Sequence, residues 1–176
     1  IDLMESAFSW DLPAAIRYPN MATEAPSRTP MHRPLGKGEL LAEGSDVLLI
    51  GLGHMCETAL VVRKELEQYG VTATVLDPIF VKPLDTDLLC NLLMTHNKVV
   101  TIEEHALMGG LGNAVNHFLA THGYTSIQAL NFGIPDAFVG HGSYGSLIEE
   151  LGLTPQQITE KTIQHFSLGK ASHALH

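Results

Sequence analysis

The chain of 176 residues has few cysteines, few charges and no long apolar run. Its two cysteines, Cys56 and Cys90, stand among apolar residues on expected helices, which predicts buried free thiols and a reducing compartment. No apolar run is long enough to span a membrane, and the first residues, IDLME, lack the basic segment of a signal peptide. The net charge of −9 argues against nucleic acid and anionic membranes as partners.

Several catalytic signatures are also missing from the sequence. It has no GxSxG nucleophile elbow, no Walker loop and no CxxC pair. We therefore predict no catalytic residue, no cofactor-binding residue and no metal ligand in this chain. What the chain does have is a globular composition, with 45% hydrophobic residues, which is enough to bury a core.

Short β-branched or aliphatic runs alternate with amphipathic helical stretches along most of the chain. Expected strands cover residues 14–18, 38–41, 46–50, 72–76, 98–102 and 126–130; expected helices cover residues 1–9, 55–69, 112–122 and 143–151. Two further helices have clear start signals, with Asp85 as one N-cap and Thr154, Pro155 and Gln157 forming a capping box at the other. This alternation predicts an α/β fold with a mostly parallel sheet and helices on both faces. The turn at residues 42–45 predicts a hairpin between its two flanking strands.

A GLG turn at residues 51–53 follows an expected strand and opens a helix. A dinucleotide site would need a third glycine near position 56, where Cys56 stands, and an acidic residue after the next strand. Asp77 could serve as that residue, but Pro78 follows it directly. We prefer a tight strand-to-helix turn over a nucleotide site.

Glu103 and Glu104 end an expected strand, and His105 follows them. Two carboxylates and an imidazole could form an acid/base pair or a metal site. Adjacent residues of an extended chain point to opposite faces, however, so they do not readily converge on one ion. We favour an interface or helix-capping role for this pair.

A glycine-rich segment with Gly109, Gly110 and Gly112 precedes the next helix. Its backbone N–H groups could hold an anion or a carboxylate, and close packing against a neighbour explains the glycines equally well. Among ten scattered histidines, His141 lies between two glycines in a loop and is the most interesting, although we do not assign it a direct role.

Six segments together resemble the 1-deoxy-D-xylulose-5-phosphate synthase family of the transketolase superfamily. They read AIRYP at 15–19, GKGE at 36–39, FVKPLD at 80–85, VTIEE at 100–104, MGGLG at 108–112, and GIPDAF at 133–138 followed by HG at 141–142. The segments are in family order and at family-like spacing.

The resemblance implies a transketolase C-terminal domain at residues 38–168, preceded by a short remnant of the pyrimidine-binding domain at 1–20 and a linker at 21–37. Residues 169–176 would form a flexible tail. Under this reading Glu103, Glu104, Gly109, Gly110 and Gly112 belong to an interface of the intact enzyme. The chain would be a C-terminal piece of a longer protein, without the cofactor-binding and catalytic domains.

The resemblance also implies a reaction that joins pyruvate to glyceraldehyde 3-phosphate with loss of CO2. The product feeds isoprenoid, thiamine and pyridoxal synthesis. The intact enzyme would be a homodimer that needs thiamine diphosphate and Mg2+, in the bacterial cytoplasm or the plastid stroma, whereas this chain alone would be inactive and bind neither cofactor. A non-catalytic dimerisation or regulatory module of the same fold is the alternative.

One departure concerns the substrate. The family reads RYPRG at the first strand end, and its second arginine is linked to the phosphate of the aldehyde. Here Asn20 takes that place, and asparagine cannot replace a permanently charged, bidentate phosphate ligand. Either another cation substitutes, with Arg17 or Arg28 as the nearest candidates, or phosphate binding is weakened. Arg17 and Asn20 are the expected substrate contacts.

Overall fold

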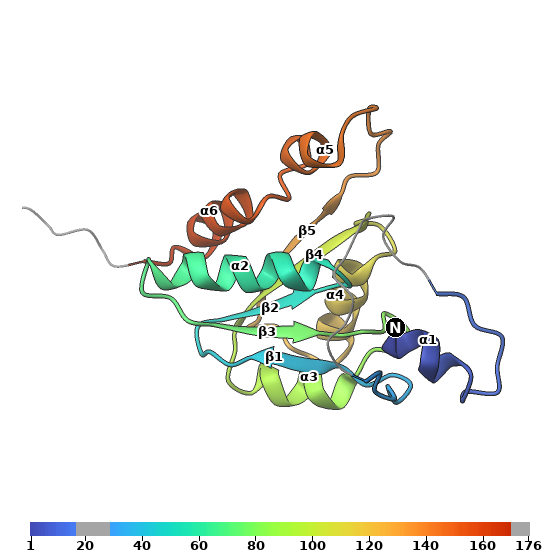
Figure 1. Cartoon of the computed structure of the whole chain (residues 1–176). Coiled ribbons are helices and arrows are strands. Elements are labelled where there is room, and N and C mark those ends of the chain that lie inside the picture. The colour runs from blue at the N-terminus through green and yellow to red at the C-terminus, as the bar shows by residue number, and fades with distance from the viewer. Residues whose placement is uncertain (17–28, 170–176) are drawn as a thin grey trace, which may run out of the picture.

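The computed structural model describes residues 1–16 and 29–169, and its main feature is a five-stranded sheet in the order β1-β3-β2-β4-β5 (Figure 1). The strands are β1 (Glu39–Ala42), β2 (Val47–Gly51), β3 (Ala73–Asp77), β4 (Lys98–Ala106) and β5 (Gln128–Ile134). All neighbours pair in parallel except β1, which runs antiparallel to β3. The predicted α/β class and the mostly parallel sheet are confirmed.

The predicted hairpin between β1 and β2 is wrong. The chain does turn at residues 42–45, but β3 lies between the two strands and pairs with both. The turn itself is fastened to β3, because the Gly44 amide donates to Thr74 Oγ1 at 2.9 Å and Thr74 Oγ1 donates to the Gly44 carbonyl at 2.9 Å. A local turn signal could not show that a third strand would be inserted.

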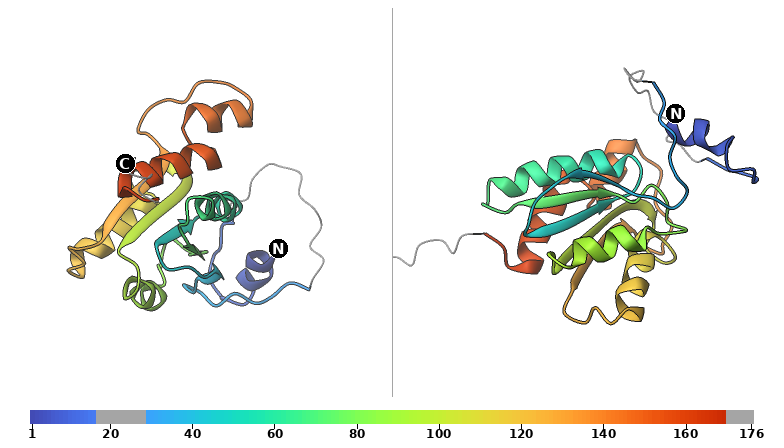
Figure 2. Two further views of the ribbon diagram at one scale, coloured as in Figure 1. Left: turned by 90° about the vertical axis from the view of Figure 1, so that its left-hand side faces the viewer. Right: turned by 90° about the horizontal axis from the view of Figure 1, so that it is seen from below.

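Helices cover both faces of the sheet, as predicted (Figure 2). On one face α2 (Met55–Glu67) and α6 (Pro155–Phe166) pack on alternate strand residues such as Val47, Leu49 and Val75. On the other face α3 (Thr86–Leu93) and α4 (Leu111–Thr121) pack on the intervening residues, among them Leu48 and Ile50. The central strand β2 is buried along its whole length, as expected for a strand covered on both faces.

The predicted helix starts are confirmed for α3 and α6. Asp85 accepts a hydrogen bond from the Leu88 amide, and Thr154 and Gln157 form the reciprocal capping box of α6 with Pro155 in the first turn. The short helix α5 (Tyr144–Glu150) begins at Ser143, whose side chain accepts from the Ser146 amide. None of the residues of α5 is buried.

The N-terminal segment lies beside this unit. Helix α1 (Asp2–Ala7) is followed by an irregular chain, so the described part of the predicted strand at residues 14–18 is not a strand. The cysteines differ from each other: Cys56 is buried, as predicted, whereas Cys90 is partly exposed. No helix in the described ranges is long and apolar enough to cross a membrane.

Candidate functional site

The strand order places a topological switch point between β2 and β4. From β2 the chain moves to β3 on one side, and β4 then adds on the other side. In open parallel sheets, ligands bind at the carboxyl ends of the strands at this point. The residues that follow β2 and those that end β4 are therefore the first place to look for function.

The end of β2 turns sharply into helix α2. Gly51 closes β2 against α2, and a Cβ there would lie only 2.8 Å from the Met55 carbonyl oxygen. Gly53 follows with a φ of +62°, a conformation that favours glycine. The GLG segment is thus the tight strand-to-helix turn that the sequence predicted, and it delivers His54 to the N-cap of α2.

Glu103 lies at this edge but points into the protein. Its side chain is completely buried, and its two carboxylate oxygens accept hydrogen bonds from the Leu111 amide at 2.7 Å and the Gly112 amide at 2.8 Å. These donors are unpaired backbone groups of the first turn of α4, where a negative charge is also favoured by the helix dipole. The structure thus gives Glu103 a helix-capping role inside the chain.

The glycines of this segment make the capping possible. A Cβ on Gly110 would lie 2.2 Å from Glu103 Oε2, and one on Gly112 would lie 2.9 Å from Thr101 Oγ1. Gly109 instead has a φ of +82° with open space around it. Both explanations of these glycines are therefore correct. The backbone amides hold a carboxylate, which is that of Glu103, and the absence of side chains on Gly110 and Gly112 allows the close packing.

Glu104 points to the opposite side of β4, as strand alternation predicts. Its Oε2 lies 2.9 Å from His54 Nε2, and its Oε1 accepts a short hydrogen bond from the hydroxyl of Tyr144. His54 Nε2 also lies 2.9 Å from the Tyr144 oxygen. Burial, together with the bond to Glu104, raises the pKa of Tyr144 well above its ordinary value, so the phenol stays protonated as a donor.

These three residues form a side-chain cluster at the switch point. We call His54, Glu104 and Tyr144 the edge triad. The sequence pointed to Glu104, but it assigned no role to His54 and gave no signal for Tyr144. The 90 residues between His54 and Tyr144 explain the omission, because no local pattern links them.

The other predicted residues do not join this cluster. His141 is exposed in the loop before α5, and His105 Nδ1 lies 3.1 Å from the neighbouring Ala106 carbonyl oxygen. Arg17, Asn20 and the alternative cation Arg28 lie outside the described residues, as does residue 170 onward of the predicted tail. In the ranges 1–16 and 29–169, no group of three or more His, Cys, Asp or Glu side chains could hold a metal ion.

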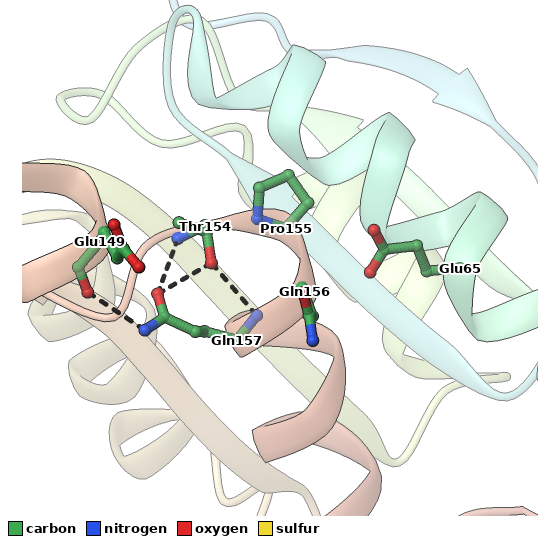
Figure 3. A pocket seen from close by; sticks show the side chains of 6 residues that line it. All are labelled: Glu65, Glu149, Thr154, Pro155, Gln156 and Gln157. Carbon is green, nitrogen blue, oxygen red and sulfur yellow. Dashed lines mark hydrogen bonds between the residues drawn. The ribbon is translucent and has the colours of Figure 1, made fainter. Parts of the chain in front are cut away.

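A pocket of about 440 Å3 lies elsewhere, between α2, α5 and the start of α6 (Figure 3). It is lined by Glu65, Glu149, Thr154, Pro155, Gln156 and Gln157. Its polar groups already bond to protein: Gln157 Nε2 donates to the Glu149 carbonyl at 3.1 Å, and Glu65 accepts from the Thr159 hydroxyl at 2.7 Å. Both of these bonds join helices to each other, which indicates a structural junction.

Fold and site together define an α/β domain of the doubly wound type whose polar edge groups bond to one another. Residues 36–158 match the family described as transketolase, C-terminal domain. The chain therefore belongs to the transketolase C-terminal domain family. The family that the sequence resembles is thereby confirmed at the level of the domain.

Comparison with individual proteins shows which members of the family the chain is similar to. The chain is 47% identical over 171 residues to the 1-deoxy-D-xylulose-5-phosphate synthase of Chlamydia felis, covering 94% of this chain and 26% of that protein. A solved split-gene transketolase, titled an inactive beta4 tetramer, is 33% identical with a TM-score of 0.73 over 83% of this chain and 48% of that one. A transketolase mutant from Pichia stipitis, at 15% identity, 80% and 20% coverage and a TM-score of 0.55, shares the fold. The chain thus spans about a quarter of the length of its curated relatives.

Proposed function

We propose that this chain is the C-terminal portion of a thiamine-diphosphate-dependent transferase that condenses pyruvate with glyceraldehyde 3-phosphate to 1-deoxy-D-xylulose 5-phosphate, with release of CO2. The observation that carries the proposal is the 47% identity to a synthase of that name over 94% of this chain. The product would serve isoprenoid, thiamine and pyridoxal synthesis. We place the enzyme in the bacterial cytoplasm or the plastid stroma, as a homodimer.

The described residues do not fit a diphosphate or Mg2+ site. The first-turn amides of α4, where the glycine-rich segment could have held an anion, are occupied by Glu103. No metal-binding group of side chains occurs in the described ranges either. We therefore propose that thiamine diphosphate and Mg2+ are held by other parts of the enzyme, and that this chain supports them as a scaffold and an interface.

Of the five residues expected at an interface, Glu104 is partly exposed and Gly109 exposed, whereas Glu103, Gly110 and Gly112 are buried. We propose that Glu104 and Gly109 meet the rest of the enzyme and that the three buried residues shape this edge from within. Arg17 and Asn20 are the proposed contacts to the phosphate of the aldehyde substrate. The alternative function is a non-catalytic dimerisation or regulatory module, and the split-gene relative, solved as an inactive tetramer, gives that reading its support.

A domain exchange tests the proposal. The matching quarter of the Chlamydia felis synthase is replaced by this chain, and formation of 1-deoxy-D-xylulose 5-phosphate is measured beside the unmodified enzyme and a version that lacks the quarter. We expect the exchange to restore activity to within about tenfold of the unmodified enzyme, which corresponds to about 1.4 kcal/mol in the barrier. A folded chimera that binds thiamine diphosphate but remains as inactive as the truncated enzyme would contradict the proposal.

A thiamine-diphosphate titration of the chain alone tests the second part. We expect no saturable heat of binding up to millimolar cofactor in the presence of Mg2+. Micromolar binding would show that the chain holds a cofactor site of its own.

A further inference from the structure

Helix α5 and the loop before it form an arm that stands out from the body of the domain (Figure 1). We call residues 135–150 the α5 arm. No residue of α5 is buried, and Phe138 in the loop is fully exposed. Only Ile148 of the arm is counted among the side chains packed on the apolar core. Apolar burial therefore contributes little to holding the arm in place.

Polar contacts, and not apolar burial, hold the α5 arm in place. The Tyr144 hydroxyl, in the first turn of α5, donates to Glu104 at the end of β4 and lies 2.9 Å from His54 Nε2 before α2. With its one proton on Nε2, His54 can share that proton between the Tyr144 oxygen and the Glu104 carboxylate, because both accept. The three contacts close a ring among three elements, and the carboxylate of Glu104 strengthens the two in which it is the acceptor.

A second polar contact fastens the far end of the arm. Gln157 Nε2 of α6 donates to the Glu149 carbonyl at 3.1 Å. This contact holds the C-terminal end of α5 next to α6, to which it is joined in sequence. The edge triad is therefore the contact that decides whether the N-terminal end of the arm stays on the sheet.

The position of the triad gives the arm a function beyond packing. His54 follows β2 and Glu104 ends β4, so the two flank the topological switch point, and Tyr144 reaches them from outside. In this arrangement Tyr144 brings the N-terminal end of α5 to the edge at which an open parallel sheet presents its binding crevice. Release of Tyr144 would free a carboxylate and an imidazole at that point.

We propose that the α5 arm is a lid over the switch point and that the edge triad is its latch. The closed state is the one seen here, and the open state is reached by breaking the Tyr144 bonds without unfolding the sheet. The inference does not depend on which reaction the longer enzyme catalyses.

Amide hydrogen exchange tests the latch. The Leu147 amide donates to the Ser143 carbonyl and the Leu151 amide to the Leu147 carbonyl, so both report on α5. Tyr144→Phe removes the hydroxyl and keeps the ring, and we expect exchange at these two amides to become about tenfold faster. Exchange at Ile158 in α6 and at Val100 in β4 should not change.

Tyr69→Phe is the matched control, since Tyr69 is 46% exposed against 47% for Tyr144 and lies at the other end of α2. We expect it to leave α5 exchange unaltered. Glu104→Gln keeps one acceptor but loses the charge, so it should accelerate α5 exchange less than Tyr144→Phe does. The double variant should add little to Tyr144→Phe, because both changes act on the same contact.

Two results would overturn the proposal. The first is α5 exchange in Tyr144→Phe that equals that of the unmodified chain, which would mean that Ile148 and Gln157 hold the arm without the latch. The second is a parallel rise at Val100, which would mean that Tyr144 stabilises the whole sheet and not a separate lid.

Discussion

Glu103 and Glu104 are neighbours in sequence but have different environments. Glu103 is fully buried on the α4 side of β4, where both oxygens accept backbone amides, whereas Glu104 reaches the partly exposed edge triad. Strand alternation separates the pair, so the sequence alone predicted that they could not share one ion. What remained hidden was the partner of each carboxylate, because those partners lie 8 or more residues away along the chain.

The buried carboxylate leads to the first prediction. Glu103→Gln keeps the shape of the side chain but places an NH2 group against one of the two backbone amides, so one donor loses its acceptor. We expect the free energy of unfolding to fall by about 2–3 kcal/mol. Urea unfolding followed by circular dichroism measures it.

Glu160→Gln provides the control for that change. Glu160 is exposed on α6, and its carboxylate accepts one bond from Gln156 Nε2, which glutamine can also accept. We expect Glu160→Gln to lower the free energy of unfolding by less than about 0.5 kcal/mol. Equal midpoints for the two variants would show that the Glu103 bonds do not stabilise the fold.

Asp85 shows how a cap becomes dependent on pH. Burial raises the pKa of its carboxyl group, but hydrogen bonds from the Leu88 and Gly38 amides and from Lys37 lower it by more, so the pKa is lowered overall. A group with a lowered pKa in the folded state stabilises the protein above its unfolded pKa, and the contribution is lost as pH falls through the folded value. The relevant window therefore lies below about pH 4.

The second prediction follows from that sign. Asp85→Ala should lower the free energy of unfolding by about 1–2 kcal/mol at neutral pH. The difference in this free energy between the variant and the unmodified chain should become smaller as pH falls below about 4. Urea unfolding at several pH values measures both. Asp87→Ala is the control, since Asp87 also contacts Lys37 but its side chain is 86% exposed. A cost for Asp85→Ala that stays constant down to the lowest pH would contradict the linkage.

At the scale of elements, helix α4 depends on a close approach that only glycine permits. A Cβ on Gly110 would lie 2.6 Å from the Ala106 carbonyl oxygen as well as against Glu103, and neither backbone nor buried carboxylate can move freely. Gly145 in α5, in contrast, has nothing within 4 Å of the same position. A side chain at position 110 would therefore clash with its neighbours, whereas one at position 145 would have room.

The third prediction compares them. Gly110→Ala should lower the free energy of unfolding by about 2–4 kcal/mol through overpacking. Gly145→Ala should be neutral or raise the stability of α5 by up to about 1 kcal/mol, because alanine favours helix. Thermal unfolding and α5 amide exchange measure the two effects. A Gly110→Ala protein as stable as the parent would show that the α4 start can shift away from Glu103.

Elements with a local signal were the ones that the sequence predicted correctly. The α3 cap at Asp85 and the α6 capping box at Thr154 are each encoded within four residues, and the structure confirms both. The β1–β2 hairpin failed because pairing depends on where β3 inserts, which no turn sequence records. The same limit hid Tyr144, whose partners come from two other elements.

At the scale of the whole molecule, Arg33 joins the N-terminal helix to the sheet. Its guanidinium donates to Asp2 of α1 through Nε at 3.0 Å and to Glu39 of β1 through Nη1 at 2.6 Å. The Arg33 amide also donates to the buried Ser6 hydroxyl at 2.7 Å. One planar, permanently charged group therefore links α1 to β1. Trp10, just beyond α1, packs against Phe80 with ring centroids 5.7 Å apart.

The last prediction uses Trp10, the single tryptophan of the chain, as a reporter of this arrangement. Arg33→Met removes the cation that Asp2 and Glu39 share, and we expect docking of the N-terminal segment to weaken by about 1–3 kcal/mol. Trp10 emission should then shift to the red and become more accessible to acrylamide. Arg33→Lys should give an intermediate result, because one ammonium group cannot reproduce the two-sided fork.

Arg63→Met, which breaks an ion pair with Glu67 on α2, should leave Trp10 unchanged. Equal acrylamide quenching of Trp10 in Arg33→Met and the unmodified chain would mean that the Trp10–Phe80 contact and the backbone bonds to Ser6 and Asp2, and not the ionic bridge, hold α1 on the domain.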